Sequence, residues 1–225
     1  MRDETPSRTI PPLYARLLAS SRPNSEDRAE AFECGEDLVV VIADGAGGLR
    51  GGAEASEVLV VAVRTAVHDR SFDVRDPARW LRIFADVDLS LSAKMTGETT
   101  GLIVVLSVAG VVGVSAGDSE AWIVRPTSID DLTKEQSKVR LGSGRASPVV
   151  FERESLDGVL VAGTDGLFKY AASDRIAAAV RDCSTMEATE HLVGLVRLTS
   201  GAFPDDVAVV VVATRPNDGE RGRPS

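Results

Sequence analysis

The sequence is poor in the residues on which several kinds of functional site depend. Of its 225 residues, only 2 are histidine and 2 are cysteine, and aromatic residues make up 4%. The low aromatic content favours a core of β-branched and small side chains over an aromatic binding surface. Cys34 and Cys183 stand alone, without CxxC spacing. A disulfide between them and two free buried thiols both remain open, and we favour two free thiols in a reducing cytosol.

The sequence also has fewer positive than negative charges, and its first residues lack an apolar core. The net charge is -9, which argues against a nucleic-acid partner because phosphate backbones attract clustered Lys and Arg. The first twelve residues, MRDETPSRTIPP, lack an apolar core and do not form a secretory signal, so we expect a cytoplasmic protein. Residues 99–117 carry no charge over about the length of a bilayer span, but their glycines and valines favour two strands joined at Ala109–Gly110. We therefore expect no membrane partner.

The hydrophobic pattern predicts helices and strands in blocks. Apolar residues at helical spacing predict helices at 51–69, 76–94, 174–181 and 186–198. Valine-rich runs predict strands at 37–43, 99–108, 111–116, 120–125, 150–156, 158–164 and 207–214. Clustered strands with paired helices on either side indicate an α+β fold in which two sheets face each other with helices outside. A parallel doubly wound sheet is the alternative.

The length is that of one domain. We expect a single domain over residues 11–214, with polar tails at 1–10 and 215–225 that contain proline and glycine. Nothing in the sequence suggests self-association, and we expect a monomer.

Acidic residues stand at the ends of the predicted strands. Asp44 follows the run 37–43, Asp118 follows VVGVSA, Asp165 follows VLVAGT, and Asp205 precedes VAVVVV. Each alone is compatible with a simple turn. Strand ends at one edge of a sheet converge, however, and converging carboxylates repel unless a cation or proton lies among them. Because no histidine or cysteine joins them, the oxygen-only set indicates Mg²⁺ or Mn²⁺ rather than Zn²⁺.

At these residues the sequence resembles the metal-dependent serine/threonine protein phosphatases of type 2C, the PPM family. The segment ADGAGGLRGGAEAS (43–56) is similar to the DGxGGxxxGxxAS element of the family. The other similar elements follow in the family's order along nearly the whole chain: RPNSED (22–27), GETTGLIVVL (97–106), AGDSEAWIV (116–124), DLTKEQS (131–137), GTDGLF (163–168) and DDVAVVVV (205–212).

The resemblance implies a fold and a set of roles. The fold is a four-layer αββα sandwich of two antiparallel β-sheets flanked by helices. Asp44 would bridge two Mn²⁺ or Mg²⁺ ions, and Arg22 would hold the substrate phosphate. The remaining ligands implied are Asp165 and Asp205 for one ion, Glu26 or Asp27 and the Gly45 carbonyl for the other, and Asp118 for a third, weaker ion.

The implied reaction is hydrolysis of phosphoserine and phosphothreonine in a phosphoprotein substrate. Two cations lower the pKa of a shared water, and the resulting hydroxide attacks phosphorus in line. Arg22 and the cations spread the charge of the phosphoryl oxygens. The partner would be a dedicated phosphoprotein opposed by a kinase, in a signalling role typical of compact bacterial members.

The sequence departs from the family pattern at several positions. Ala46 stands where eukaryotic members carry a histidine, and Glu120 replaces the usual arginine of the GDSR element. Asp206 replaces the usual Asn beside Asp205, where it would assist a metal or be solvated, and we favour the solvated side chain. His68 and His191 fall within helical patterns and are expected to be surface or structural residues.

The largest departure is a short connection between Ser137 and Asp165. It has 27 residues, where the family usually carries a flap subdomain, and RLGSGRASP (140–148) is expected to be a short loop. We therefore expect an open site and weaker third-ion binding at Asp118. The alternative functions are a pseudophosphatase or regulatory binding module that keeps the fold with little turnover, a flapless phosphatase with one dedicated partner, and an unrelated hard-metal hydrolase of small phosphoesters.

Overall fold

The fold contains eleven strands among the described residues. The computed structural model describes residues 13–19, 25–46 and 51–214. The predicted tails at 1–10 and 215–225, and Arg22, lie outside them. The strands are β1 (Leu13–Ala19), β2 (Asp27–Cys34), β3 (Asp37–Ala46), β4 (Glu98–Thr99), β5 (Gly101–Ser107), β6 (Gly110–Ala116), β7 (Glu120–Val124), β8 (Ile129–Asp131), β9 (Val149–Arg153), β10 (Val159–Gly163) and β11 (Val207–Ala213).

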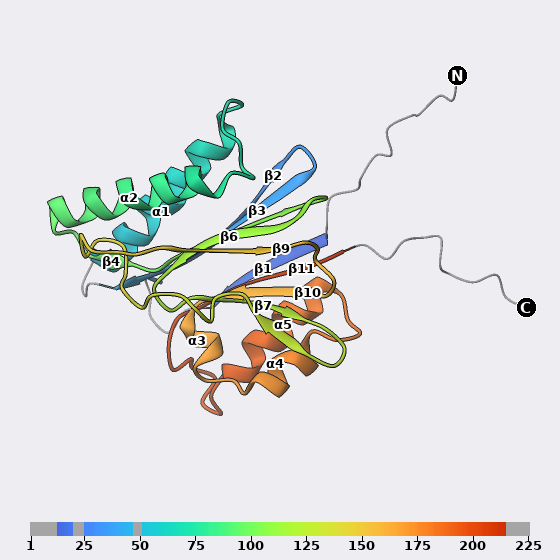
Figure 1. Ribbon diagram of the computed structural model, residues 1–225. Helices are drawn as coiled ribbons and strands as arrows, with labels where there is room; N and C mark the ends of the chain where they lie inside the picture. Colours follow the sequence, from blue (N-terminus) through green and yellow to red (C-terminus); the bar gives the residue numbers. More distant parts are fainter. Residues whose placement is uncertain (1–12, 20–24, 47–50, 215–225) are drawn as a thin grey trace, which may run out of the picture.

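The strands form two antiparallel sheets that pack face to face. One sheet has the order β1-β11-β10-β7-β8, and the other has the order β2-β3-β5-β6-β9, with β4 paired to β3. The helices are α1 (Gly51–His68), α2 (Pro77–Lys94), α3 (Asp165–Phe168), α4 (Ser173–Ala179) and α5 (Thr185–Val196). Figure 1 shows α1 and α2 on the outer side of the β3 sheet and α3, α4 and α5 on the outer side of the β11 sheet. The predicted four-layer αββα sandwich is confirmed.

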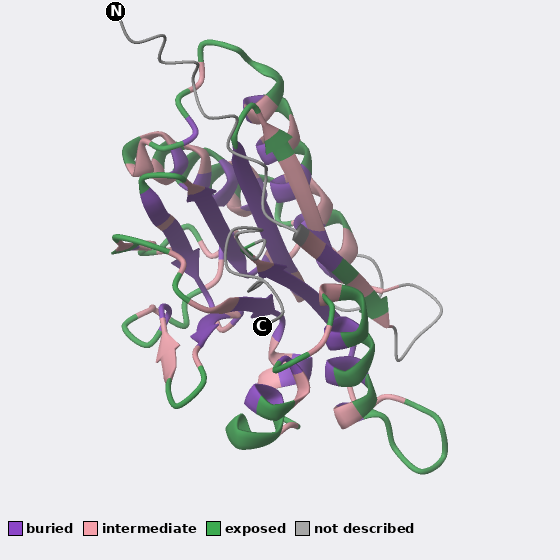
Figure 2. Cartoon of the chain, turned by 90° about the vertical axis from the view of Figure 1, so that its right-hand side faces the viewer, coloured by how far each residue is buried: buried purple, intermediate pink, exposed green. Residues whose placement is uncertain are grey.

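Uniformly apolar strands serve two cores at once. In β3, Val39 and Val41 pack with α1 and α2, whereas Val40 and Ile42 pack between the sheets. The valines of β11 divide in the same way, between the other sheet and the helices α4 and α5. Because successive side chains point to opposite faces, a strand buried on both faces must be apolar throughout. Figure 2 shows the resulting buried strands in purple.

Several further predictions can be compared with the fold. The uncharged segment 99–117 forms β4, β5 and β6, as expected, and none of the described helices combines the length and apolar character that a bilayer span requires. Cys34 and Cys183 are unpaired and half-buried rather than fully buried. The predicted helices and strands are present to within a few residues. The strands β1, β2 and β8 and the one-turn helix α3 were not predicted.

The short connection after β8 is a loop, as expected. Residues 132–148 contain turns and one isolated bridge between Leu141 and Thr99, but neither helix nor strand. This loop therefore lies against β4 and contains no subdomain of its own.

Candidate metal centre

Three carboxylates meet at one end of the sandwich. Asp44 lies near the end of β3, Asp118 in the turn between β6 and β7, and Asp165 at the start of α3. Each offers an oxygen, and these three oxygens lie within 4.8 Å of one another. All three residues are half-buried. The structure thus joins residues that are far apart in the sequence, as strand-end placement predicted.

Burial and neighbouring carboxylates raise the pKa of Asp44 and Asp165. Burial raises the pKa of Asp44 to about 7, and the neighbouring charges of Asp165 and Asp118 add to the rise. Burial also raises the pKa of Asp165, with further contributions from Asp118 and Asp205. Such a group is stable only with bound protons or a cation. Its all-oxygen donors fit a hard divalent ion such as Mg²⁺ or Mn²⁺.

Asp27 lies beside this cluster in the sheet. It is 3% exposed and pairs directly with Asp44 in the β2–β3 register. The Thr164 hydroxyl donates a hydrogen bond of 2.7 Å to Asp27 Oδ2 and accepts one of 3.0 Å from the Ala208 backbone N–H. Burial, together with the charge of Asp44, raises the pKa of Asp27 to about 8. Asp27 therefore lies at a position that favours a held proton.

Hydroxyl groups fix the backbone of Asp44. The Thr100 hydroxyl accepts a hydrogen bond of 2.9 Å from the Asp44 N–H, and the Thr100 N–H donates one of 2.8 Å to the Asp44 carbonyl. The hydroxyls of Thr100 and Ser119 are 2.6 Å apart. Since Ser119 follows Asp118, one buried hydroxyl pair links the segments that carry two of the carboxylates.

Gly45 and Gly52 let the start of α1 approach the end of β3. A methyl group at Gly45 would overlap the Gly52 carbonyl, so only glycine fits there. A methyl group at Gly52 would lie 2.6 Å from Glu26 Oε1 and 2.8 Å from the Gly45 carbonyl oxygen. These two oxygens therefore face the same small space. Of the two acidic residues considered for this position, Glu26 is the one that lies beside the Gly45 carbonyl.

The segment that precedes β11 carries Asp205 and Asp206. Asp205 is half-buried and near enough for its charge to raise the pKa of Asp165, but it is not among the three converging carboxylates. The expectation of a solvated Asp206 was wrong. Asp206 is 6% exposed, and its Oδ2 accepts a hydrogen bond of 3.0 Å from the Glu26 N–H. It joins the segment before β11 to the start of β2.

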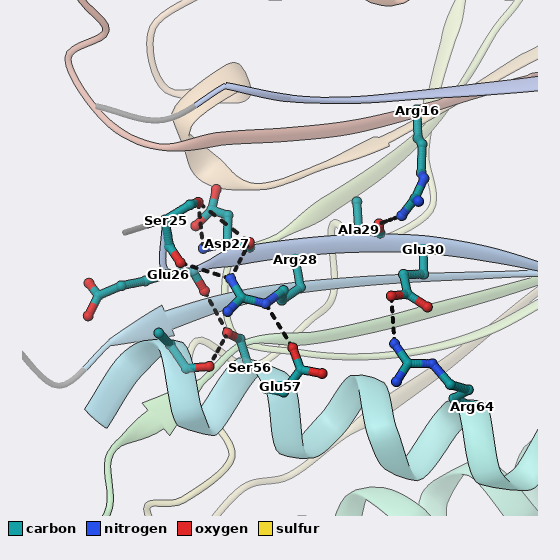
Figure 3. A network of polar contacts seen from close by, with 11 residues as sticks. Arg16, Ser25, Glu26, Asp27, Arg28, Ala29, Glu30, Ser56, Glu57 and Arg64 are labelled. Atoms are coloured by element: carbon teal, nitrogen blue, oxygen red, sulfur yellow. Dashed lines mark hydrogen bonds and ion pairs between the residues drawn. The ribbon is translucent and has the colours of Figure 1, made fainter. Parts of the chain in front are cut away.

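Helix α1 holds β2 through polar contacts shown in Figure 3. The Ser56 hydroxyl donates a hydrogen bond of 2.6 Å to the Glu26 carbonyl, which also accepts one of 3.2 Å from the Gly45 N–H. Further along, Arg28 pairs with Glu57 at 3.0 Å and Arg64 pairs with Glu30 at 2.7 Å. The DG and GGAEAS parts of the first motif thus position Glu26 as well as Asp44.

The other residues singled out in the sequence lie as follows. Ala46 ends β3 and is half-buried, while His68 and His191 are exposed on helices, as expected. Glu120 accepts a hydrogen bond of 2.8 Å from the indole N–H of Trp122, so its carboxylate turns to a neighbouring side chain of β7.

Sequence reasoning missed the polar residues that support the carboxylates. Thr100, Thr164 and Ser119 each stand next to a recognised motif residue, and hydroxyls at strand ends could have suggested them. Arg140 was also missed: its guanidinium Nη2 lies 3.4 Å from Asp118 Oδ1. It belongs to the loop 132–148, whose sequence has no periodicity that would place a side chain.

Comparisons with known proteins agree with this geometry. No family model matches the sequence. The probable protein phosphatase 2C 55 of Arabidopsis thaliana is 30% identical over 165 residues, which cover 66% of this chain and 34% of that protein. The chain therefore spans about a third of the length of this curated relative.

Solved structures show the same architecture. The Staphylococcus aureus serine/threonine phosphatase Stp1 superposes with a TM-score of 0.80 at 17% identity, covering 96% of this chain and all (100%) of that one. The Mycobacterium tuberculosis serine/threonine phosphatase PstP superposes with a TM-score of 0.78 at 20% identity, covering 92% and 100%. The chain has the fold of the type 2C (PPM) phosphatases.

One solved relative of the type 2C family bears on the carboxylates. A crystal structure of the PstP catalytic domain, described as a complex with 2 manganese ions, superposes with a TM-score of 0.76 at 21% identity, covering 89% of this chain and 97% of that one. The structural likeness establishes the type 2C fold of this chain. The roles of individual residues rest on the geometry described above.

Proposed function

We propose that this chain is a Mg²⁺- or Mn²⁺-dependent serine/threonine protein phosphatase, a hydrolase of phosphoric monoesters. The observation that carries the proposal is the convergence of Asp44, Asp118 and Asp165 within 4.8 Å at the end of a type 2C fold. The two manganese ions of the PstP catalytic domain support the choice of metal and the expectation of two ions.

The oxygens that would bind the two ions come from both sides of Asp44. We propose that Asp44 would be a ligand of both ions, that Asp165 and Asp205 would help to hold one of them, and that Glu26 and the Gly45 carbonyl would help to hold the other. When bound, such ions lower the pKa of a shared water and so supply the attacking hydroxide. The support for the Glu26 side is the shared space at Gly52.

Asp27 and Ala46 bear on which group can supply a proton to the reaction. Without bound ions, burial and the charge of Asp44 raise the pKa of Asp27 to about 8, so its carboxyl can hold a proton beside Asp44 until cations bind. Ala46 offers no donor, so the departing alcohol takes its proton from water. Arg22, outside the described residues, would bind the phosphate bidentately.

We further propose that the substrate is a dedicated phosphoprotein of a cytoplasmic signalling pathway, met by a monomeric enzyme. The short loop 132–148 leaves substrate selection to surfaces away from the centre. This part of the proposal rests on the short loop 132–148 and on the type 2C fold.

The test is hydrolysis of an aryl phosphate and a phosphothreonine peptide with Mn²⁺, in wild type, Asp44→Asn and the distant control Asp157→Asn. We expect Asp44→Asn to lower kcat/KM at least about a hundredfold, the scale of losing a main electrostatic element of a site, and Asp157→Asn to act like wild type. If wild type and Asp44→Asn are equally inert while wild type binds Mn²⁺, the protein is a binding module and the proposed activity is wrong.

A further inference from the structure

An arginine lies inside the acidic cluster. The Arg140 guanidinium contacts Asp118 at 3.4 Å, and its charge lowers the pKa of both Asp44 and Asp165. One cationic side chain therefore acts on all three converging carboxylates. Its Nε is buried and has no hydrogen-bond partner among the described residues. The guanidinium thus lies beside Asp118 with a salt bridge through Nη2 and no hydrogen-bond partner for Nε among the described residues.

The loop holds Arg140 in place through its neighbour Leu141. The N–H groups of Leu141 and Thr99 each donate a hydrogen bond of 2.9 Å to the other's carbonyl. Leu141 is fully buried in the core beneath α1 and α2. Because Thr99 also contacts the Asp44 carbonyl through its hydroxyl, at 3.2 Å, Arg140 and Asp44 are anchored to the same short strand β4.

Helix α2 provides a second anchor for the loop. The buried carboxylate of Asp88 accepts backbone hydrogen bonds of 2.7 Å from Gly142, 2.9 Å from Gly144 and 3.2 Å from Ala146. Three charge-assisted hydrogen bonds fix the residues directly after Arg140. The arginine therefore extends from a rigid support, and the entropy of ordering its backbone is lost on folding rather than on binding.

The position of this charge has a consequence for cations at Asp118. A positive charge within about 4–6 Å of a carboxylate lowers its affinity for a proton by roughly 1–3 pKa units. For the same electrostatic reason it weakens the binding of a metal cation to that carboxylate. The guanidinium is permanently charged, so it cannot leave the cluster by deprotonation. A divalent ion at Asp118 must bind against this charge.

We propose that Arg140 is an internal cation of the metal centre, which competes with a divalent ion at Asp118. In the wild-type chain, Arg140 then neutralises Asp118, the carboxylate that it contacts, and ions bind more tightly on the Asp44 side than at Asp118. The inference rests on the proposed function, since it assumes that the cluster binds divalent ions. It goes further in assigning a role to a residue of the loop 132–148.

The test is Mn²⁺ binding to the full chain, followed by isothermal titration calorimetry and by the electron paramagnetic resonance signal of free Mn²⁺. We expect Arg140→Gln to tighten the weakest Mn²⁺ at least about tenfold, the lower end of the effect of one adjacent charge. Arg140→Lys retains the charge and should bind like wild type. The matched control is Arg145→Gln, which removes the same charge from an exposed side chain of the same loop and should also bind like wild type.

Asp118→Asn locates the effect. Added to Arg140→Gln, it should abolish the gain in affinity of the weakest Mn²⁺. In the wild-type background it should change the affinity of the tighter Mn²⁺ ions less than about threefold, because Arg140 already neutralises Asp118. This second variant also decides the matter if Arg140→Gln does not fold. A tenfold loss in the affinity of the tighter ions on Asp118→Asn alone would overturn the inference, since Asp118 would then be a ligand of those ions despite Arg140.

The outcomes separate this inference from the proposed function. If wild type binds Mn²⁺ and Arg140→Gln matches Arg145→Gln, Arg140 is no competing cation and the inference is wrong while the metal site remains. A raised KM for the phosphopeptide with unchanged Mn²⁺ binding would also overturn the inference and would assign Arg140 to substrate binding. If wild type binds no Mn²⁺ at millimolar concentration, the proposed function fails and this inference fails with it.

Discussion

Strand β3 carries one aspartate at its start and another near its end, and the two carboxylates have opposite surroundings. At its start, Asp37 is buried and receives two hydrogen bonds of 2.8 Å from the Arg75 guanidinium. Near its end, Asp44 faces Asp118 and Asp165, and its pKa is raised to about 7. At the start of β3, Arg75 compensates the charge of Asp37. Near the end of β3, Arg140 compensates only part of the negative charge of the cluster.

The same contrast recurs along β8 and β10. Away from the cluster, Arg153 binds both oxygens of Asp130 and Arg125 binds Asp157, and these hydrogen bonds lower the pKa of both carboxyls. At the cluster, burial raises the pKa of Asp165, which follows β10. Of the aspartates compared, those away from the cluster are paired with arginines, whereas the negative charge of the cluster is compensated only in part.

The largest expected effect is on the stability of the metal-free protein. The pKa of Asp27 is raised from 3.8 to about 8, so the folded state holds a proton that the unfolded state releases. Stability is then full below about pH 4 and falls as pH rises through 8, by up to about 6 kcal/mol at roughly 1.4 kcal/mol per unit. Urea unfolding in a chelator at pH 5 and pH 8 measures the part of this fall that lies between the two pH values, about 4 kcal/mol.

Divalent ions should remove most of that loss. Mn²⁺ at pH 8 should restore the free energy of unfolding, and it should have much less effect at pH 5, where protons occupy the carboxyls. Equal stability of the chelated protein at both pH values would mean that the acidic end is not under charge strain.

A smaller effect is expected from Thr164→Val. This change removes the hydrogen bond to Asp27 and leaves the Ala208 N–H buried without its partner, at a cost of about 1–3 kcal/mol. It should also raise the pKa of Asp27 further, so the loss of metal-free stability should extend to higher pH. The control is Thr189→Val, since the Thr189 hydroxyl only bonds the Met186 carbonyl within α5. Equal effects of both variants would contradict a special role for Thr164.

The smallest effect is expected at the compensated end. Arg153→Gln breaks the pair with Asp130, whose side chain is 23% exposed, and should cost about 1 kcal/mol or less. Because this pair lowers the folded pKa of Asp130, its contribution exists above the unfolded pKa and is lost as pH falls below about 4. Its loss should be the same with and without Mn²⁺, as measured by thermal unfolding, and any dependence on Mn²⁺ would break the contrast between the two ends.

Much of the architecture could be predicted because strong apolar periodicity encodes it. Runs such as 207–214 and 37–43 are long and uniform, so β11 and β3 were predicted almost to their ends. Strand β2 was missed because Ala29 and Ala31 are weak strand formers set between charged residues, and tertiary pairing with β3 overrides that local preference.

The residues of the candidate site also fall into those that the sequence could predict and those that it could not. Asp44, Asp118 and Asp165 could be predicted because strand ends and motifs locate them. The burial of Asp206 and the position of Arg140 could not, because both depend on partners far away in the chain. Asp206 meets Glu26, 180 residues away, and the Arg140 loop is fixed by Asp88, 54 residues from Gly142.

The most direct test of an uncompensated acidic end is Mn²⁺ affinity in wild type, Asp44→Asn and Asp157→Asn. We predict that wild type and Asp157→Asn bind Mn²⁺ with equal affinity at pH 8, and that Asp44→Asn binds it at least about a hundredfold more weakly. Equal Mn²⁺ affinity in wild type and Asp44→Asn would contradict the assignment of this end of the sandwich as a metal centre.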